Sequence, residues 1–150
     1  MKYITEIIVE KPIDEVMELF KNPEYLKFWQ RGLKSTKLLK GVSGEKGAKR
    51  KLNIRLEGRD ITMIETITKC ELPNHWHAKY TSKGMVSYQY NYFEKTPENH
   101  TYWKTTSEFK FSGFMRIVGK VLPGLFKKRS ETVMKDFKKF AEKGITVSDY

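Results

Sequence analysis

Hydrophobic and polar residues alternate along several short stretches of the chain, and turn residues separate these stretches. Alternation with a period of two is typical of β-strands that bury one face. The pattern predicts about seven strands, at Thr5–Glu10, Ser35–Lys40, Ala48–Leu56, Ile61–Cys70, His75–Thr81, Met85–Phe93 and His100–Phe111. Because most of them follow one another through short loops, we expect a curved antiparallel sheet.

Helical spacing replaces this alternation in two places. After the first strand, Pro12 begins one short helix, and Asn22-Pro23 separates it from a second. Towards the other end, apolar residues recur from Phe114 to Lys143 as expected for one long C-terminal helix. A helix that follows a series of strands buries its apolar face against the sheet, and a curved sheet that grips one helix leaves a cavity. We therefore predict a single α+β domain over residues 1–150.

The long helix is interrupted at Pro123-Gly124. A proline inside a helix costs about 3 kcal/mol unless the helix kinks or restarts, so we expect a kink or a break there. The part before it, Phe114–Leu122, is apolar almost all round, which is more than one packed face requires. Ordinary burial is the default interpretation, and a mobile gate or a membrane-touching element are the alternatives.

The loops predict which residues lie opposite one another in the sheet. Gly58-Arg59 suits a two-residue turn, Ser82-Lys83-Gly84 a three-residue loop and Thr96–Asn99 a four-residue loop. The resulting pairs are Tyr92 with Trp103, Tyr90 with Thr105, Tyr88 with Ser107, Val86 with Phe109, Ile54 with Met63, Leu52 with Glu65, and Tyr80 with Glu65. All the hairpins agree on one inner face, and a one-residue slip in any of them would break that agreement.

This inner face mixes apolar groups with Tyr, Thr, Ser and Trp, whereas a dry core would favour Val, Ile and Leu. Such a mixture can line a pocket for an apolar or amphipathic molecule. The alternative is that the tyrosines span the sheet and reach water at its rim. The predicted ligand-contacting residues are Ile54, Met63, Glu65, Trp76, Tyr80, Tyr88, Tyr90, Tyr92, Trp103, Thr105, Ser107 and Phe109 from the sheet, with Val118 and Leu122 from the helix.

Three of the inner residues are candidates for catalysis. Arg50 is predicted one diagonal step from Glu65, about 7–8 Å away, and Tyr80 lies on the other side of Glu65. An ion pair with a tyrosine could anchor a ligand carboxylate or hydroxyl, or serve acid–base chemistry. The alternatives are a self-satisfied structural pair, or strand-end residues that reach solvent.

Other chemistry is poorly supported. His75 and His77 share a strand face, but the register places it outside, and only His100 is left as a third histidine. Cys70 is the only cysteine and has no nucleophile motif around it. Neither a glycine-rich phosphate loop nor a nucleophile elbow is found. We therefore expect no metal and no cofactor.

Composition narrows the cellular setting and the partners. One cysteine excludes an intramolecular disulfide, and Met1–Glu10 lacks the apolar run of a signal peptide, so we expect a cytoplasmic protein. The net charge is +11, with the basic residues spread over Lys27–Arg55 and Arg116–Lys143. This charge could attract nucleic acid or anionic lipid, but a solvated basic surface is the favoured interpretation.

The order of elements resembles the helix-grip fold of the START-like, or Bet v 1-like, superfamily (SRPBCC). The local likeness lies in the run Ile8–Val16, then Leu19-Phe20, Asn22-Pro23 and Phe28-Trp29, and in the tail from Gly113 to Lys138. These segments look like the bacterial polyketide cyclase/dehydrase and lipid-transport group. The resemblance implies a hydrophobic cavity between the sheet and the long helix, and it implies no catalytic residues.

Three functions follow as hypotheses. The first is binding or transport of a small apolar or amphipathic ligand, lipid-like or polyketide-like. The second is a polyketide cyclase or dehydratase that uses Arg50, Glu65 and Tyr80. The third is a peripheral binder of anionic lipid or nucleic acid, through the basic surface and without nucleic-acid sequence specificity. The sequence indicates no oligomeric state.

Overall fold

Seven strands form one antiparallel sheet in this computed structural model, which describes residues 1–147. The strands follow the order β1-β7-β6-β5-β4-β3-β2. Their bounds are β1 (Lys2–Val9), β2 (Leu33–Lys40), β3 (Lys49–Leu56), β4 (Arg59–Glu71), β5 (His75–Ser82), β6 (Met85–Lys95) and β7 (Thr101–Phe111). The predicted α+β class and the antiparallel sheet are therefore confirmed, and β1 and β2 form the two edges.

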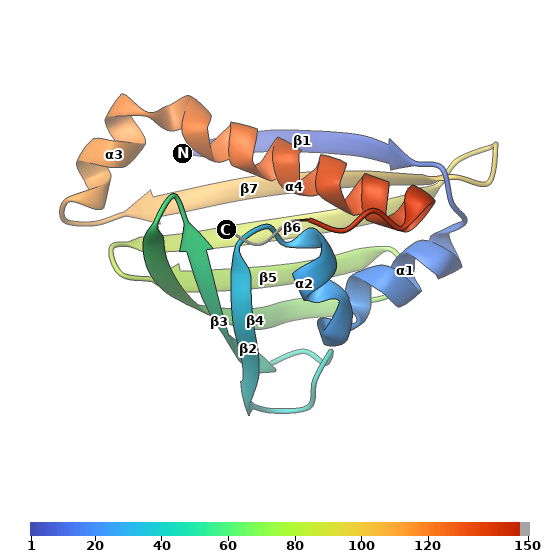
Figure 1. Ribbon diagram of the computed structural model, residues 1–150, viewed down its shortest axis with the longest axis horizontal. Coiled ribbons are helices and arrows are strands. Elements are labelled where there is room, and N and C mark those ends of the chain that lie inside the picture. Colours follow the sequence, from blue (N-terminus) through green and yellow to red (C-terminus); the bar gives the residue numbers. More distant parts are fainter. Residues whose placement is uncertain (148–150) are drawn as a thin grey trace.

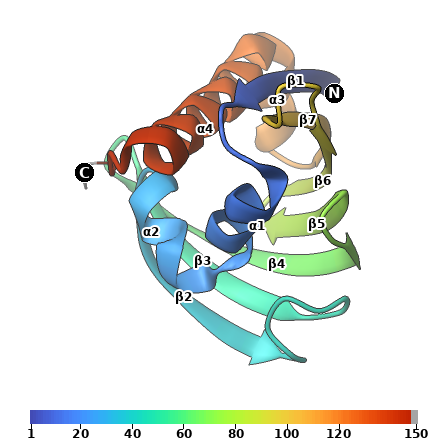
Figure 2. The same cartoon turned by 90° about the vertical axis from the view of Figure 1, so that its right-hand side faces the viewer.

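The helices lie on the concave side of the sheet, and the sheet curves around the longest of them (Figures 1 and 2). Between β1 and β2 come α1 (Ile13–Lys21), the short 3₁₀ helix η1 (Pro23–Tyr25) and α2 (Leu26–Trp29). After β7 come α3 (Met115–Val121) and α4 (Pro123–Lys143). No helix in residues 1–147 is both long and apolar enough to cross a membrane.

The expected single C-terminal helix is two helices, and the predicted break at Pro123-Gly124 is confirmed. The backbone angles of Leu122, φ −124° and ψ 52°, are not helical, and a new helix, α4, begins at Pro123. Proline is tolerated there because its missing N–H would have no partner in a first turn. At the other end, Gly144 closes α4 in the left-handed conformation, with φ 66°.

The core is a cluster of aromatic rings where α1, α2 and α4 meet the sheet. The ring centroid of Phe20 lies 5.0 Å from that of Phe93 and 5.5 Å from that of Trp103. Phe137 of α4 packs edge-on to Trp29, with their centroids 4.9 Å apart. Burying such large rings supplies much of the hydrophobic free energy of folding.

Ordinary burial of the segment Phe114–Leu122 was the default expectation, and it is wrong. Phe114 is 73% exposed and Val121 is 68% exposed. The reason lies in where α3 is placed: it stands beyond the end of α4, away from the helices that cover the sheet (Figure 1).

The predicted strand faces are correct on both sides of β6. Glu65 lies opposite Tyr80 and Ile67 opposite Ala78, as predicted. In the β3–β4 pair the register differs by two residues, so that Ile54 faces Ile61 and Arg50 faces Glu65. A shift of two leaves every side chain on the predicted face. β2 pairs with β3 through two register shifts, one near each of its ends.

Strand β6 alone is turned over relative to the prediction. The turn before it has two residues, Lys83 and Gly84, because Ser82 pairs with Met85. The loop after it has five residues, because Lys95 pairs with Thr101. The register of β6 therefore differs by one residue from the prediction on each side, against β5 and against β7. A one-residue difference exchanges the two faces of β6, whereas the inner faces of β5 and β7 stay as predicted.

Candidate ligand-binding cavity

A cavity of about 380 Å³ lies between the inner face of the sheet and helix α4. Its walls run from Ser43 and Gly44 in the β2–β3 loop to Met115 in α3 and Phe126 in α4. The aromatic core closes one side, through residues such as Phe20 and Trp29. Eight of the predicted ligand-contacting residues line it: Ile54, Met63, Glu65, Trp76, Tyr80, Trp103, Thr105 and Phe109.

The predicted tyrosines of β6 do not reach this cavity. Tyr88, Tyr90 and Tyr92 lie on the outer face because β6 is turned over. There the rings of Tyr88 and Tyr90 stack with an interplanar angle of 9°, and Tyr92 packs edge-on to His75, 5.4 Å between centroids. Both interpretations placed the tyrosines on the inner face, lining a pocket or reaching water at the rim of the sheet, and both are therefore wrong.

Three other predicted contacts are also absent from the cavity wall. Ser107 is fully buried, and its Oγ donates to Oε1 of Gln89 at 2.7 Å. Val118 belongs to α3, and Leu122 is half exposed at the joint between α3 and α4. Both residues lie on the segment around α3, which covers only the end of the sheet, and this explains why the single-helix prediction misplaced them.

One wall of the cavity is apolar. Strands β3 and β4 contribute Leu52, Ile54, Ile61 and Met63 side by side. Met85, Phe109 and Phe126 continue this surface towards α3. An apolar surface of this kind favours hydrocarbon over water.

The opposite wall is a polar row on β6 and β7, and sequence reasoning missed its β6 members. Ser87, Gln89 and Asn91 point inward, where tyrosines were predicted. Asn91 Oδ1 accepts hydrogen bonds from Trp103 Nε1 at 2.9 Å and from Thr105 Oγ at 2.7 Å. Because two donors occupy that oxygen, the Asn91 amide presents its NH₂ group as the next available donor. The signal that could have found this row is Lys83-Gly84, since glycine in the second place of a two-residue turn readily takes the positive φ of 76° found there.

Two further polar atoms border the cavity without a hydrogen-bond partner. They are the Thr5 hydroxyl and the indole N–H of Trp29, and each residue is only 3% exposed. Leaving a buried donor unsatisfied costs about 1–3 kcal/mol. Both atoms are enclosed by the protein, so a ligand oxygen would satisfy them only after neighbouring side chains moved aside.

Glu65 and Tyr80 form the pair that the sequence predicts. Tyr80 Oη donates to Glu65 Oε2 at 2.8 Å, and both residues line the cavity. Burial raises the pKa of the Glu65 carboxyl, while the Tyr80 hydrogen bond and the charge of Arg50 act in the opposite direction. Burial also raises the pKa of Tyr80 well above its ordinary value. The phenol therefore stays protonated, and the carboxyl holds its proton to higher pH than an exposed glutamate.

Arg50 lies directly across the strand pair from Glu65 but makes its hydrogen bonds elsewhere. Its guanidinium donates to Ser43 Oγ at 2.8 Å and to Thr36 Oγ at 3.3 Å. These bonds hold the β2–β3 loop against β3 at one end of the cavity. The proposed three-residue catalytic group is therefore a close Glu65–Tyr80 pair with a more distant arginine.

Helix α4 is fixed over the cavity by polar contacts on both sides. Tyr3 of β1 donates to the carbonyl of Phe126 at 3.0 Å and lies 2.7 Å from Ser130 Oγ. On the other side, Arg31 binds both carboxylate oxygens of Asp136, at 3.1 and 3.0 Å. The cavity is thus closed by a helix that is tied to β1 and to the segment after α2.

Several solved structures match this architecture over nearly the whole chain. A conserved protein from Geobacillus kaustophilus has a TM-score of 0.82 at 17% identity, covering 96% of this chain and 97% of that one. Ginseng major latex-like protein 151 from Panax ginseng has a TM-score of 0.74 at 12% identity, covering 95% and 97%. Ara h 8.0201 has a TM-score of 0.72 at 12% identity, covering 94% and 97%. The chain has the Bet v 1-like helix-grip fold. Identities this low show the fold and no more.

The predicted helix-grip fold is therefore confirmed, while membership of the START-like, or Bet v 1-like, superfamily stays a prediction. The narrower likeness to the polyketide cyclase/dehydrase and lipid-transport group stays a prediction. No protein-family model matches the chain, and no curated protein is significantly similar to it in sequence.

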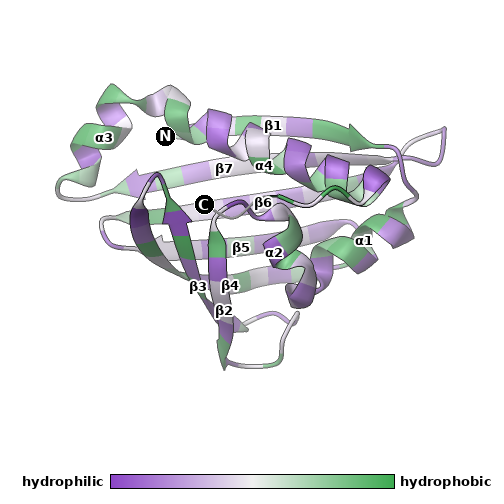
Figure 3. Cartoon of the chain, in the orientation of Figure 1, coloured by the Kyte–Doolittle hydropathy of each residue, from purple (hydrophilic) through white to green (hydrophobic). Residues whose placement is uncertain are grey.

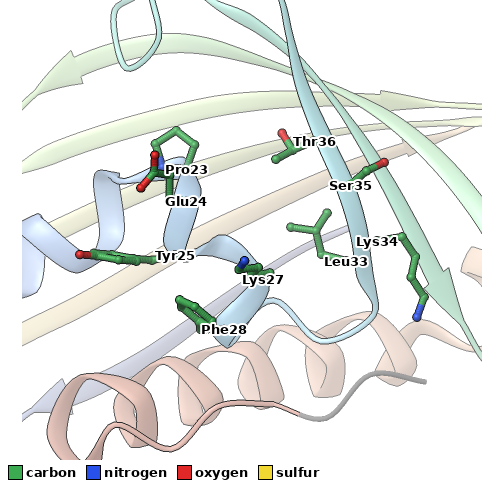
Figure 4. Close-up of a pocket in the computed structure, with 9 residues that line it drawn as sticks. All are labelled: Pro23, Glu24, Tyr25, Lys27, Phe28, Leu33, Lys34, Ser35 and Thr36. Carbon is green, nitrogen blue, oxygen red and sulfur yellow. The ribbon is translucent and has the colours of Figure 1, made fainter.

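A second hollow of about 440 Å³ lies outside the space between the sheet and α4. It is formed by η1, α2 and the first half of β2, and Figure 4 shows its nine lining residues. Charged side chains such as Glu24, Lys27 and Lys34 border it. We take the interior cavity as the candidate site, because it combines an apolar wall with the Glu65–Tyr80 pair and the inward polar row of β6.

His75 and His77 lie on the outer face of the helix-grip sheet, as the sequence predicts. The rings of His75 and His77 are 5.7 Å apart and pack against the β6 tyrosines. Within residues 1–147, no group of three or more His, Cys, Asp or Glu side chains is arranged to hold a metal ion. Cys70 is partly exposed, and burial raises the pKa of its thiol.

Proposed function

We propose that this protein binds one small amphipathic molecule in the cavity between the sheet and α4. The observation that carries the proposal is the division of the cavity into an apolar wall on β3 and β4 and a polar row on β6 and β7. A volume of about 380 Å³ lies within the usual range for small-molecule sites, about 300–1,000 Å³. Such a site suits a ligand with a hydrocarbon part and an oxygen-bearing head.

The polar groups indicate the chemistry of the ligand's head. The Asn91 amide presents its NH₂ group as a donor, which favours a carbonyl, carboxylate or hydroxyl oxygen. Arg50 and Arg129 also line the cavity, and so does Arg31, which is paired with Asp136, whereas the one carboxyl in the lining, that of Glu65, is favoured in its neutral form by burial. The electrostatics therefore favour an oxygen-rich head over a cationic one.

Filling the cavity tests this proposal. Met63 lies on the apolar wall, whereas its neighbour Thr62 is exposed on the outer face of the same strand. Met63→Trp should weaken binding of fatty acids or aromatic polyketides at least tenfold, and the matched Thr62→Trp should leave it unchanged. Affinity is measured by calorimetry, after native mass spectrometry of protein from its own host has identified a bound molecule. Equal affinities of the two variants would contradict the proposal.

A second candidate function is acid–base catalysis on the bound molecule. It is favoured by the Glu65–Tyr80 hydrogen bond at the cavity wall and by the raised pKa of Glu65, which makes its carboxylate a stronger base than that of an exposed glutamate. A polyketide-like substrate has acidic protons next to its carbonyls, and a carboxylate could abstract one.

Glu65→Gln separates catalysis from binding. The amide keeps an oxygen that can accept the Tyr80 hydrogen bond, but it cannot take up a proton. If the protein is an enzyme, turnover of a polyketide-like substrate should fall at least a hundredfold while ligand affinity changes little. Unchanged turnover would remove Glu65 from the chemistry, and the binding proposal would stand.

A further inference from the structure

The joint between α3 and α4 carries a concentrated group of exposed apolar side chains, which we call the α3 patch. Its members are Phe114, Ile117, Val121, Leu122 and Leu125, which are 73%, 59%, 68%, 50% and 51% exposed. Phe114, Ile117 and Val121 follow helical spacing and so share one side of α3. Large apolar side chains gathered on one exposed surface mark an interaction site more often than chance exposure does.

The fold holds this patch away from the rest of the molecule. On the other side of α3, Gly119 lies against the ring of Phe111, so closely that an added Cβ would be 2.5 Å from Phe111 Cδ2. Met115 packs beside Gly84 in the turn between β5 and β6. Because these contacts use the inner side of α3, the patch faces outward, where the helix projects at one end of the molecule (Figure 3).

Positive charge surrounds the α3 patch. From residue 109 to residue 130 the chain has no Asp or Glu and six basic residues: Lys110, Arg116, Lys120, Lys127, Lys128 and Arg129. Arg116, Lys120, Lys127 and Lys128 are exposed, and the neighbouring turn adds Lys83. Apolar side chains among lysines and arginines are the composition of helices that lie in the interface of an anionic membrane.

We propose that the α3 patch docks this protein onto an anionic lipid surface. Phe114, Ile117 and Val121 enter the boundary between headgroups and acyl chains, and the lysines contact lipid phosphates. A nucleic acid would satisfy the lysines but would leave the aliphatic side chains in water, so the joint pattern selects lipid. The proposal goes beyond ligand binding, because it places one end of the cavity at the membrane. Met115 and Phe126 line that end from the same two helices.

Vesicle flotation with matched variants tests the docking. The wild type should bind vesicles of phosphatidylcholine with phosphatidylserine and should bind phosphatidylcholine alone much more weakly. Phe114→Ser combined with Val121→Ser should weaken binding at least tenfold, since both side chains leave the acyl boundary. The control combines Ile8→Ser with Val42→Ser, which are 51% and 61% exposed at other places, and it should bind like the wild type.

The charges are tested separately. Lys120→Gln and Lys127→Gln should each weaken binding to the phosphatidylserine vesicles about fivefold. Equal binding to both kinds of vesicle, or a control pair that loses as much binding as the patch pair, would overturn the proposal. So would a wild type that binds DNA but no vesicles. Retention of the cavity ligand in the patch pair, read by native mass spectrometry, keeps this outcome distinct from that of ligand binding.

Discussion

The buried carboxyl of Glu65 lines the cavity, and its ionisation affects the stability of the folded protein. It is 8% exposed, and its carboxyl faces a cavity with apolar walls, where the charged form loses much of its hydration. Burial therefore raises its pKa above the ordinary 4.5, although the Tyr80 hydrogen bond favours the ionised form. Ionisation of Glu65 therefore destabilises the folded protein relative to the unfolded chain.

This cost predicts a pH dependence of stability. Between pH 4.5 and the raised pKa of Glu65, the folded state binds more protons than the unfolded state. The contribution of Glu65 to the free energy of unfolding therefore falls as pH rises through that window. In Glu65→Gln this fall should disappear, which urea denaturation at a series of pH values would reveal.

Tyr80→Phe provides the control for this experiment. Removing the phenol takes away a hydrogen bond that favours the ionised carboxyl, so the pKa of Glu65 should rise further and the fall should extend to higher pH. Parallel stability curves for the wild type and Glu65→Gln would contradict the assignment.

At this scale the sequence predicted the partner of Glu65 but not that of Arg50. The Glu65–Tyr80 contact depends on the register of β4 and β5, in which a register shift between Ile67 and Lys69 separates this pair from the turn. The side chain of Arg50 has a choice of partners, and the hydroxyls of Thr36 and Ser43 belong to a strand and a loop whose approach no pattern specifies.

Helix α4 depends on a few contacts at the scale of elements, and the pair of Arg31 with Asp136 is the strongest polar one. Asp136 has a side chain only 5% exposed, whereas Arg31 is 35% exposed. Both carboxylate oxygens accept a guanidinium N–H, which is the geometry of strong charge-assisted pairs. The pair ties the middle of α4 to the segment after α2.

Asp136→Ala should therefore destabilise the protein by about 1.5–3 kcal/mol, the usual range for hydrogen bonds to charged groups. The matched control is Asp60→Ala, which breaks the pair of Arg55 with an aspartate whose side chain is 79% exposed, and it should cost about 0–1 kcal/mol. Thermal and urea denaturation measure both. Equal losses would mean that Asp136 contributes no more than a surface charge.

Strand β6 marks the limit of prediction at the scale of elements. Its sequence has Tyr88, Tyr90 and Tyr92 at one parity and Ser87, Gln89 and Asn91 at the other. Hydrophobicity alone turns the tyrosines inward. In the structure they pack among His75, His77 and Lys79 on the outer face, with the Lys79 ammonium 5.9 Å from the centroid of the Tyr88 ring. Only the two turn lengths could have decided between the faces.

For the molecule as a whole, the order of elements was predictable because alternation and helical spacing separate cleanly along this chain. The placement of α3 was not, since a segment that is apolar on all sides gives no information about which side is covered. A cavity was also predictable in outline, but its polar wall was assigned to the wrong side chains of β6. The fold of this chain follows from its hydrophobic periodicity. Which side chains of β6 line the cavity depends instead on the exact lengths of the loops before and after that strand, and each of these differs by one residue from the prediction.

The open sheet has a consequence of its own. Unlike a closed barrel, it ends in two strands whose outer backbone groups could pair with a second sheet and lead to aggregation. On β1, the ammonium of Lys138 donates to the carbonyl of Ile8 at 2.6 Å and so occupies one of these groups. On β2, two register shifts and the lysines Lys34, Lys37 and Lys40 make the edge irregular and charged. Part of the net charge of +11 therefore protects the free edge against pairing, independently of any ligand or membrane.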